Sequence, residues 1–349
     1  YLGLLVDSGA KFDVLSDNVI NNTSYLKLDG EIKLFGESQL IQTESSDLEP
    51  NSAGYLERNR PGMANLYRYN YRSSPVSKIN VGENHQEYSV RDVLRGPAGE
   101  TINFVGGYDG SASPISIAEY WIYKFGNLFN DYSEWKQIKA DGFLKAGEGF
   151  SLKGTGTTDP LQDYTFKGKP NNGDISLSLS PDNAYLVGNP YPSAIDANEF
   201  IKDNMSTSQT DGRGLGNTTG TLYYWEHYGA DSHYLDEYQA GYSTYNLTGF
   251  TLAQPDPMVS QVGSGSLEPK RYIPVGQGFF VNSDGSTNGK VVFKNSQRVF
   301  EKEEDNNSQF FRNGNTQTTT EETNDDIKRV HFYFSQNEGI FKDLLLGVK

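Results

Sequence analysis

A short glycine-containing segment occurs twice in the chain, as AGEGF at residues 146–150 and as VGQGF at residues 275–279. Other anchors keep the same order in both copies, while the lengths between them change. They pair 74–76 with 191–193, 120–121 with 224–225, and 165–167 with 292–294. This pattern predicts two related units from an internal duplication. Duplicated β units build surfaces and stalks more often than active sites.

The two glycines of each copy have a physical role. Glycine adopts positive φ without a Cβ clash, so the pair allows a sharp bend or bulge just before a strand. The phenylalanine after each pair would anchor the strand in the core of its unit. The residues are Gly147, Gly149 and Phe150 in the first copy, and Gly276, Gly278 and Phe279 in the second.

Composition indicates a folded, strand-rich chain. The mean hydropathy of −0.63 alone would suggest disorder. Disordered chains, however, are poor in aromatic residues, and this chain has 13% aromatic residues, including 23 tyrosines and 19 phenylalanines. Such residues favour β-strands.

Charge and residue usage exclude several classes of function. A formal net charge of −15 disfavours binding to nucleic acid or to anionic membranes. Cysteine is absent, so the chain has neither disulfides nor thiolate metal ligands. No apolar run approaches the ~20 residues of a membrane-spanning helix, so we expect no membrane insertion. With neither an initiator methionine nor a signal peptide at its start, the chain is expected to be a piece of a longer, processed polypeptide.

Period-two patterns predict an all-β fold: tandem β-sandwich or jelly-roll-like modules preceded by a short β-stack. One short helix is expected near 194–202, with Ser193 as N-cap and Asp196 at its third position. The alternative for the first segment is the edge of a sandwich. The expected parts are a strand stack at 1–62, module one at 63–178, module two at 179–300, a polar linker or long loop at 301–328, and strands at 329–349 that complete module two or begin a further domain.

Metal sites are suggested by only two weak patterns. His227 and His233 lie near several carboxylates, but in an expected loop rather than at fixed spacing. Asp284 and Asn288 lie in a segment with oxygen donors and glycines that could hold calcium. The alternative for that segment is a hairpin turn. We therefore predict no metal or other cofactor, with calcium as a weak candidate.

Enzyme signatures are missing. The chain has no Gly-x-Ser-x-Gly elbow and no cysteine nucleophile. The glycine-rich residues 212–216 lack the Lys-Ser/Thr ending of a phosphate-binding loop. Carboxylate pairs for glycoside cleavage stay open, because their separation is not visible in a sequence. We predict a protein that is not an enzyme and has no catalytic residues.

Aromatic side chains are the stronger candidates for ligand contact. Trp121, Trp135, Trp225 and Tyr228 could stack on sugar rings, and His227 lies in the same polar segment as the last two. The alternative is that these side chains form part of the core, which is the more frequent fate of aromatic residues.

Residues 185–196 (YLVGNPYPSAID) resemble a sequence motif common in large secreted surface proteins of Bacteroidota. Pro190 and Pro192 in this motif indicate a rigid turn. The resemblance covers roughly residues 63–349. Its other matching segments, in matching order, are 171–175, 220–225, 272–281, 293–298 and 329–347.

This resemblance implies an extracellular cargo of the type IX secretion system, displayed at the cell surface like gliding adhesins and other surface fibres. The implied partners are the secretion and surface-attachment machinery, with other fibre subunits or surface glycans as further partners. The preferred hypothesis is a segment acting in adhesion or as a structural stalk. The alternative is a carbohydrate-binding module of a secreted glycan-degrading protein.

Overall fold

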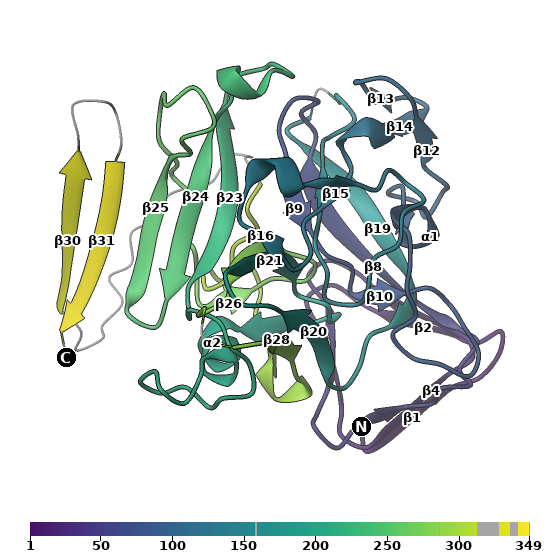
Figure 1. Ribbon diagram of the computed structural model, residues 1–349. Coiled ribbons are helices and arrows are strands. Elements are labelled where there is room, and N and C mark those ends of the chain that lie inside the picture. Colours follow the sequence, from purple (N-terminus) through teal and green to yellow (C-terminus); the bar gives the residue numbers. More distant parts are fainter. Residues whose placement is uncertain (158, 286, 313–327, 336–340, 349) are drawn as a thin grey trace.

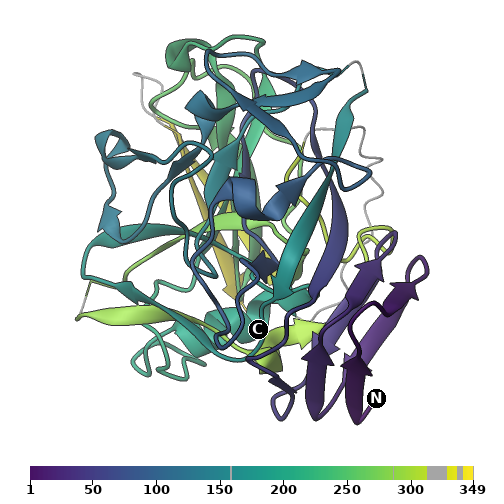
Figure 2. The same cartoon turned by 90° about the vertical axis from the view of Figure 1, so that its right-hand side faces the viewer.

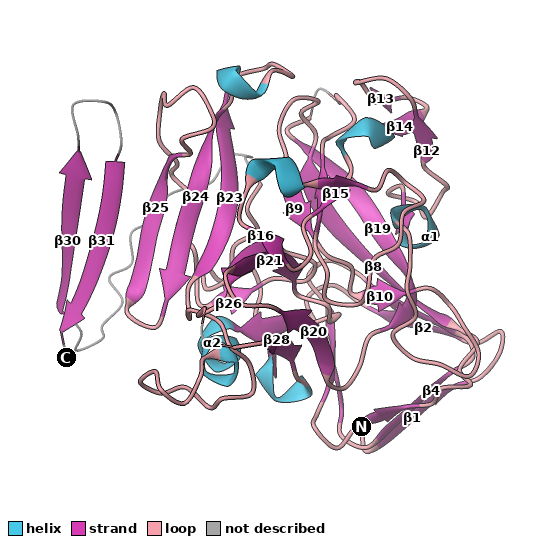
Figure 3. Ribbon diagram, viewed as in Figure 1, coloured by secondary structure: helices cyan, strands magenta, loops and turns pink. Residues whose placement is uncertain are grey.

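Strands dominate the described part of the chain, and the fold is all-β as expected (Figure 3). The computed structural model describes residues 1–157, 159–285, 287–312, 328–335 and 341–348 (Figure 1). Within these residues the strands form several sheets, and the only α-helices are α1 (Val90–Val93) and α2 (Ala197–Asn204).

Residues 1–63 form a stack of parallel strands with three sides, seen at one corner of the molecule in Figure 2. Successive turns of the chain place apolar residues such as Val6, Leu28 and Leu56 in the interior, where they are at most 5% exposed. The sides are β1 (Gly3–Val6), β4 (Tyr25–Leu28) and β7 (Asp47–Leu48); β2 (Lys11–Val14), β5 (Glu31–Leu34) and β8 (Tyr55–Met63); and β3 (Val19–Asn22) with β6 (Gln39–Gln42).

The stack is continuous with the first of the two duplicated units. Strand β8 pairs in parallel with β5 and antiparallel with β19 (Leu161–Pro170), so one sheet contains strands from both regions. The boundary expected between residues 62 and 63 falls inside β8. One hydrophobic cluster extends from Val6 in the stack to Phe166 in β19. The stack therefore shares its core with the first unit.

A second sheet, which has six strands, is antiparallel throughout and is packed on both faces. One face meets a cluster that includes Phe200 of α2, and the other meets an aromatic cluster around Trp225. The strands in spatial order are β16 (Leu128–Phe129), β21 (Asn183–Gly188), β27 (Gly278–Asn282), β23 (Leu222–Gly229), β24 (Gln239–Asn246) and β25 (Gly249–Pro255).

Shorter strands complete the two units. The boundary expected between residues 178 and 179 falls inside one of them, β20. They are β9 (Asn70–Arg72) with β18 (Phe150–Leu152); β10 (Val76–Ser77) and β11 (Leu94–Arg95) on β19; β12 (Asn103–Val105), β13 (Ser111–Ala112) and β14 (Ile115–Ala118); β15 (Tyr123–Lys124) with β17 (Lys136–Gln137); β20 (Ile175–Leu179) with β28 (Gly289–Phe293); and β22 (Ala194–Asp196), β26 (Tyr272–Ile273) and β29 (Arg298–Val299).

The two glycine segments adopt the same local structure. Gly147 has φ +88° and Gly276 has φ +73°, values that favour glycine. Phe150 and Phe279 are both fully buried at the strands after these bends. The predicted bend and anchor are present in each copy.

Each glycine segment contacts the other unit. The N–H of Gly188 donates to the carbonyl of Gly147 at 3.0 Å, and the N–H of Ser73 donates to the carbonyl of Gly276 at 2.8 Å. Bridges join Glu148 to Val187 and Gln277 to Arg72 in the same reciprocal way. The units therefore interlock, with strands β9 and β21 receiving the glycine segment of the opposite copy.

The helix near 194–202 begins later than expected. Residues 194–196 form β22, and α2 runs over Ala197–Asn204. Asp196 is the N-cap, because its carboxylate accepts from the N–H of Asn198 at 2.9 Å. Ser193 is instead fully buried and accepts from Arg298. Pro190 and Pro192 lie in the predicted turn, which is buried.

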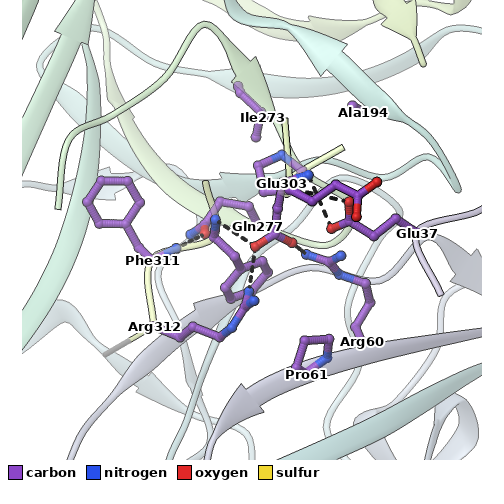
Figure 4. Close-up of polar contacts among 12 residues, drawn as sticks. Glu37, Arg60, Pro61, Ala194, Ile273, Gln277, Glu303, Phe311 and Arg312 are labelled. Carbon is purple, nitrogen blue, oxygen red and sulfur yellow. Dashed lines mark hydrogen bonds and ion pairs between the residues drawn. The ribbon is translucent and has the colours of Figure 1, made fainter. Parts of the chain in front are cut away.

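Residues 301–312, expected to be a polar linker or a long loop, contain no strand, and their last residues are packed. Phe310 and Phe311 are at most 2% exposed. Figure 4 shows Glu303 between Arg60 of β8 and Arg312, with Glu37 of the stack beside it. The carboxylate of Glu37 accepts from the N–H of Glu303 at 3.1 Å. This segment ties the stack to both units, while residues 313–327 lie outside the described part of the chain.

At the C-terminal end, β30 (Lys328–Ser335) and β31 (Phe341–Val348) form an antiparallel pair. The pair lies beside β25, at the edge of the second sheet (Figure 1). It is hydrogen-bonded as a separate two-stranded sheet.

Candidate functional site

A cavity of about 430 Å³ lies between the two units, and aromatic side chains line most of it. Its walls come from β9, from residues 120–135, and from β23, β24 and the loop after β25. Figure 1 shows β9 beside β23. The lining residues are Tyr69, Tyr71, Tyr120, Trp121, Tyr123, Tyr132, Ser133, Trp135, Ser151, Trp225, His233, Leu235, Tyr238, Tyr242, Asp256, Met258 and Val259.

Strand alternation positions the inner wall. Successive side chains of a strand point to opposite faces, so Trp225 of β23 faces the cavity while Tyr224 packs into the other core, stacked on Phe311. Tyr71 of β9 lies over Trp225 with 6.0 Å between ring centroids and an interplanar angle of 23°. Its hydroxyl is 3.2 Å from the hydroxyl of Tyr242.

The structure brings together three of the five predicted ligand-facing residues. Trp121, Trp135 and Trp225 all line the cavity, and they are the three tryptophans of the chain. Trp121 and Trp225 are each 7% exposed, so they belong both to the packed interior and to the cavity wall. The sequence presented core and ligand contact as alternatives, and ligand contact by these side chains stays a prediction.

His227 and Tyr228 do not line the cavity. His227 is 2% exposed, and its Nδ1 accepts from the N–H of Tyr69 at 3.2 Å. Burial, with Lys153 and Arg68 adding to it, lowers the pKa of His227 to about 3, so its ring is neutral at pH 7. Tyr228 is the next residue on β23, at an irregularity in its pairing with β24, and it is not among the lining residues.

Tyrosine hydroxyls are the most numerous kind of polar group around the cavity. Burial, reinforced in most cases by neighbouring tyrosines, raises their pKa values above the ordinary value of 10, so each hydroxyl keeps its proton and can both donate and accept. The residues with raised pKa are Tyr69, Tyr71, Tyr123, Tyr132, Tyr238 and Tyr242.

Lys153 is buried and contacts residues of the cavity wall. The Nζ of Lys153 lies 3.6 Å from the ring centroid of Trp121 and donates to the hydroxyl of Tyr238 at 2.8 Å. It also lies 3.2 Å from Nδ1 of His233, whose Nε2 is 2.9 Å from Asp109. The chain Asp109–His233–Lys153 therefore joins a loop of the first unit to a loop of the second.

Burial lowers the pKa of Lys153 to about 7, which makes its charge dependent on pH. The unfolded chain binds this proton up to about pH 10.4. Between these values the unfolded state holds the extra proton, so stability rises with pH. We expect the free energy of unfolding of the wild type, relative to Lys153→Met, to increase from pH 7 to pH 10 by at most about 1.4 kcal/mol per pH unit. Urea denaturation of both proteins across this range measures it, and a constant difference would contradict the assignment.

Two further polar groups lie in residues of the cavity wall. The indole N–H of Trp225 is buried and has no acceptor among the described residues. Asp256 is the one carboxylate among the described lining residues, and burial raises its pKa. The indole nitrogen of Trp225 has almost no accessible surface and is not open to the cavity, whereas Asp256 can bind hydroxyl groups.

Sequence reasoning missed the tyrosines of this wall, together with Lys153 and Asp109. The tyrosines of the chain number 23, and nothing in their spacing separates those at the cavity from the others. The one available signal was the recurrence of tyrosine at alternate positions, as in Tyr69 and Tyr71.

The weak metal candidates remain predictions. Within the described residues, no group of three or more His, Cys, Asp or Glu side chains is placed to hold a metal ion. His227 and His233 have different partners. The ring of His227 accepts from the N–H of Tyr69, and the ring of His233 contacts Asp109. Asp284 and Asn288 lie between β27 and β28, two strands that belong to different sheets, so this turn is not a hairpin.

The glycine-rich residues 212–216 are held against α2. Arg213 contacts Asp203 at 2.9 Å and Glu199 at 2.6 Å.

No helix within the described residues has the length and apolar character needed to cross a membrane.

The cavity lies largely within a segment recognised by a family model. That model, described as a domain of unknown function (DUF8693), matches residues 109–348, more than half of the 349-residue chain. Comparison with curated proteins and with solved structures gives no match. The second unit, the loops that carry His233 and Lys153, and most of the aromatic wall all fall inside the matched range, and the chain belongs to the DUF8693 family.

Proposed function

We propose that this chain is a non-enzymatic glycan-binding module of a secreted, surface-displayed protein, and that it acts in adhesion. The observation that carries the proposal is the cavity of about 430 Å³ walled by tyrosine and tryptophan side chains. Cavities of about 300–1,000 Å³ are typical of small-ligand sites.

The chemistry of the wall suits a neutral sugar. A pyranose ring has apolar C–H faces and a rim of hydroxyl groups, and aromatic rings with polar tips offer the matching surfaces. Trp225 and Trp135 present ring surfaces, while the hydroxyls of Tyr71 and Tyr242 can exchange hydrogen bonds with sugar hydroxyls. Protonated tyrosines also avoid the cost of burying a charge.

The acidic side chains support binding rather than hydrolysis. Glycoside hydrolysis ordinarily uses two carboxyl groups flanking the bond. Asp256 alone contributes a carboxyl group to the lining among the described residues. The cavity therefore provides recognition groups without the pair that cleavage uses.

The extracellular setting of the proposal rests on the resemblance to type IX secretion cargo. In that setting the strand stack of residues 1–63 would serve as part of a stalk that holds the cavity away from the cell. The partners would be the secretion and attachment machinery on one side, and surface glycans or other fibre subunits on the other.

Intrinsic fluorescence tests the proposal directly, because all three tryptophans line the cavity. We expect saturable fluorescence changes with at least one series of neutral β-linked gluco-, manno- or xylo-oligosaccharides. Trp135→Ala should weaken binding by roughly 2- to 12-fold, the range for one aromatic contact of about 0.5–1.5 kcal/mol. Trp135 is preferred to Trp225 because it is less buried, so the variant is more certain to fold.

Phe129→Ala is the matched control, since Phe129 is 64% exposed and does not line the cavity. Its affinity should equal that of the wild type. Fluorescence that is unchanged with every sugar, confirmed by calorimetry, would reject glycan binding. Release of shorter sugars during the titration would reject the non-enzymatic part of the proposal.

A further inference from the structure

Three exposed tyrosines form a platform at the mouth of the cavity. Tyr108 is 56%, Tyr120 39% and Tyr132 51% exposed. They lie in the loop between β12 and β13, in the short 3-10 helix Glu119–Trp121, and in the 3-10 helix Tyr132–Glu134. Tyr120 and Tyr132 are also lining residues of the cavity, so the platform continues its wall outward.

Contacts with neighbouring residues hold Tyr108 and Tyr120 in place. The ring of Tyr120 meets Trp121 edge to face at 4.7 Å and Tyr108 at 4.9 Å between centroids. The indole N–H of Trp121 donates to the carbonyl of Tyr108 at 2.7 Å, which fixes the loop that carries Tyr108. The side-chain amide of Gln137 donates to the carbonyl of Tyr120 at 2.8 Å. The rings of Tyr108 and Tyr120 are therefore exposed while their backbone carbonyls are held by hydrogen bonds.

Fixed, exposed tyrosines next to a binding cavity suit ligand contact. Tyrosine gives a large contact area with few rotatable bonds, so ordering it on binding costs little entropy. Edge-to-face packing of Tyr120 on Trp121 and Tyr108 covers only part of the two tyrosine rings, and Tyr108 and Tyr120 keep 56% and 39% of their surface exposed. Exposed apolar surface of this kind, adjoining a cavity, marks interaction sites.

We propose that the platform formed by Tyr108, Tyr120 and Tyr132 is a second sugar subsite, and that the ligand is a chain of neutral sugars rather than a single one. This rests on the proposed function. The cavity holds one unit, and the next unit of the same chain lies on the platform. Continuity of the wall through Tyr120 and Tyr132 gives the path between the two units.

The test compares sugars of one, two, three and four units from the β-linked gluco, manno and xylo series, using calorimetry on the full chain. For the series that binds, we expect affinity to rise by roughly 2- to 12-fold for each unit that contacts the platform. Tyr108 is the platform residue that does not line the cavity, so Tyr108→Ala should reduce this gain and keep the affinity for the single sugar. Tyr108→Phe keeps the ring and should keep most of the gain.

Tyr1→Ala is the matched control, because Tyr1 is 63% exposed and lies in the stack, away from the cavity. Melting temperatures check that each variant is folded. A gain with chain length that is unchanged in Tyr108→Ala would overturn the subsite while leaving glycan binding intact. Equal affinity for sugars of all lengths would also overturn the subsite and leave glycan binding intact. Absence of binding for every length would overturn both the subsite and the proposed function.

Discussion

The substitution Glu303→Gln is expected to lower the free energy of unfolding by about 3–5 kcal/mol, the usual cost of removing one partner of a buried ion pair. Glu303 accepts from Arg60 and from Arg312, the latter at 2.8 Å. Arg58 and Arg72 are buried nearby, where burial lowers their pKa values to about 9 and 10. Without the carboxylate, this group of guanidinium ions would be left with little compensating charge. Urea denaturation at pH 7 measures the change.

Glu304→Gln is the matched control. Glu304 is the next residue along the chain, its side chain is 55% exposed, and it pairs with Lys302 at the surface. Exposed pairs of this kind contribute about 0–1 kcal/mol. Equal effects of the two substitutions would show that the buried carboxylate does not hold the segment.

The same carboxylate predicts a dependence on acid. Burial raises the pKa of Glu303, but Arg60 and Arg312 outweigh burial and hold it at about 2, below the ~4.3 of an unfolded chain. Its contribution is therefore complete above about pH 4.3 and is lost as pH falls towards 2. The wild type should lose its advantage over Glu303→Gln within that window, and a difference that stays constant would contradict the pairing.

The substitution Gly278→Ala is expected to destabilise the protein by about 1–3 kcal/mol, the usual cost of forcing an extra methyl group into a packed site. A Cβ at this position would lie 2.8 Å from the backbone N of Arg72 and the backbone C of Tyr71. Since backbone atoms cannot rotate away, β9 must shift. Gly149→Ala should act in the same direction, because its Cβ would lie 2.8 Å from Leu186 on the reciprocal strand β21.

Gly106→Ala is the control for both glycines. No atom lies within 4 Å of a Cβ placed there, so its effect should stay within about 0.5 kcal/mol. Denaturant midpoints with unchanged slopes would measure these differences in stability. If Gly278→Ala behaved like Gly106→Ala, the close approach of the two units at β9 would be wrong.

Local features were predictable from the sequence because they depend on neighbouring residues. Alternation in residues 1–62 and the many aromatic residues indicated strands, and glycine followed by phenylalanine indicated a bend and a buried anchor at Gly147 and Phe150. The helix was placed too early because Ala194 and Ile195 have an apolar pattern that fits either structure. Pairing of β22 with β26 and β29 decided in favour of a strand.

Residues 301–312 show what local composition leaves open. Their polar character suggested a linker or a long loop, and only the packed fold reveals that Glu303 meets arginines from β8 and from its own segment. Phe310 of the same segment lies under Arg72 of β9, and Phe311 stacks on Tyr224 of β23. Contacts between residues so distant in the chain leave no trace in a local pattern.

By itself, the sequence determined an all-β chain with two related glycine bends. It also made the tryptophans candidates for ligand contact. It could not determine which aromatic side chains share a cavity, because the second sheet is buried on both faces. With apolar residues on either side, period-two alternation no longer distinguishes one face from the other. Only the interlocking of the two units, which places Tyr71 of the first over Trp225 of the second, decided where the cavity forms.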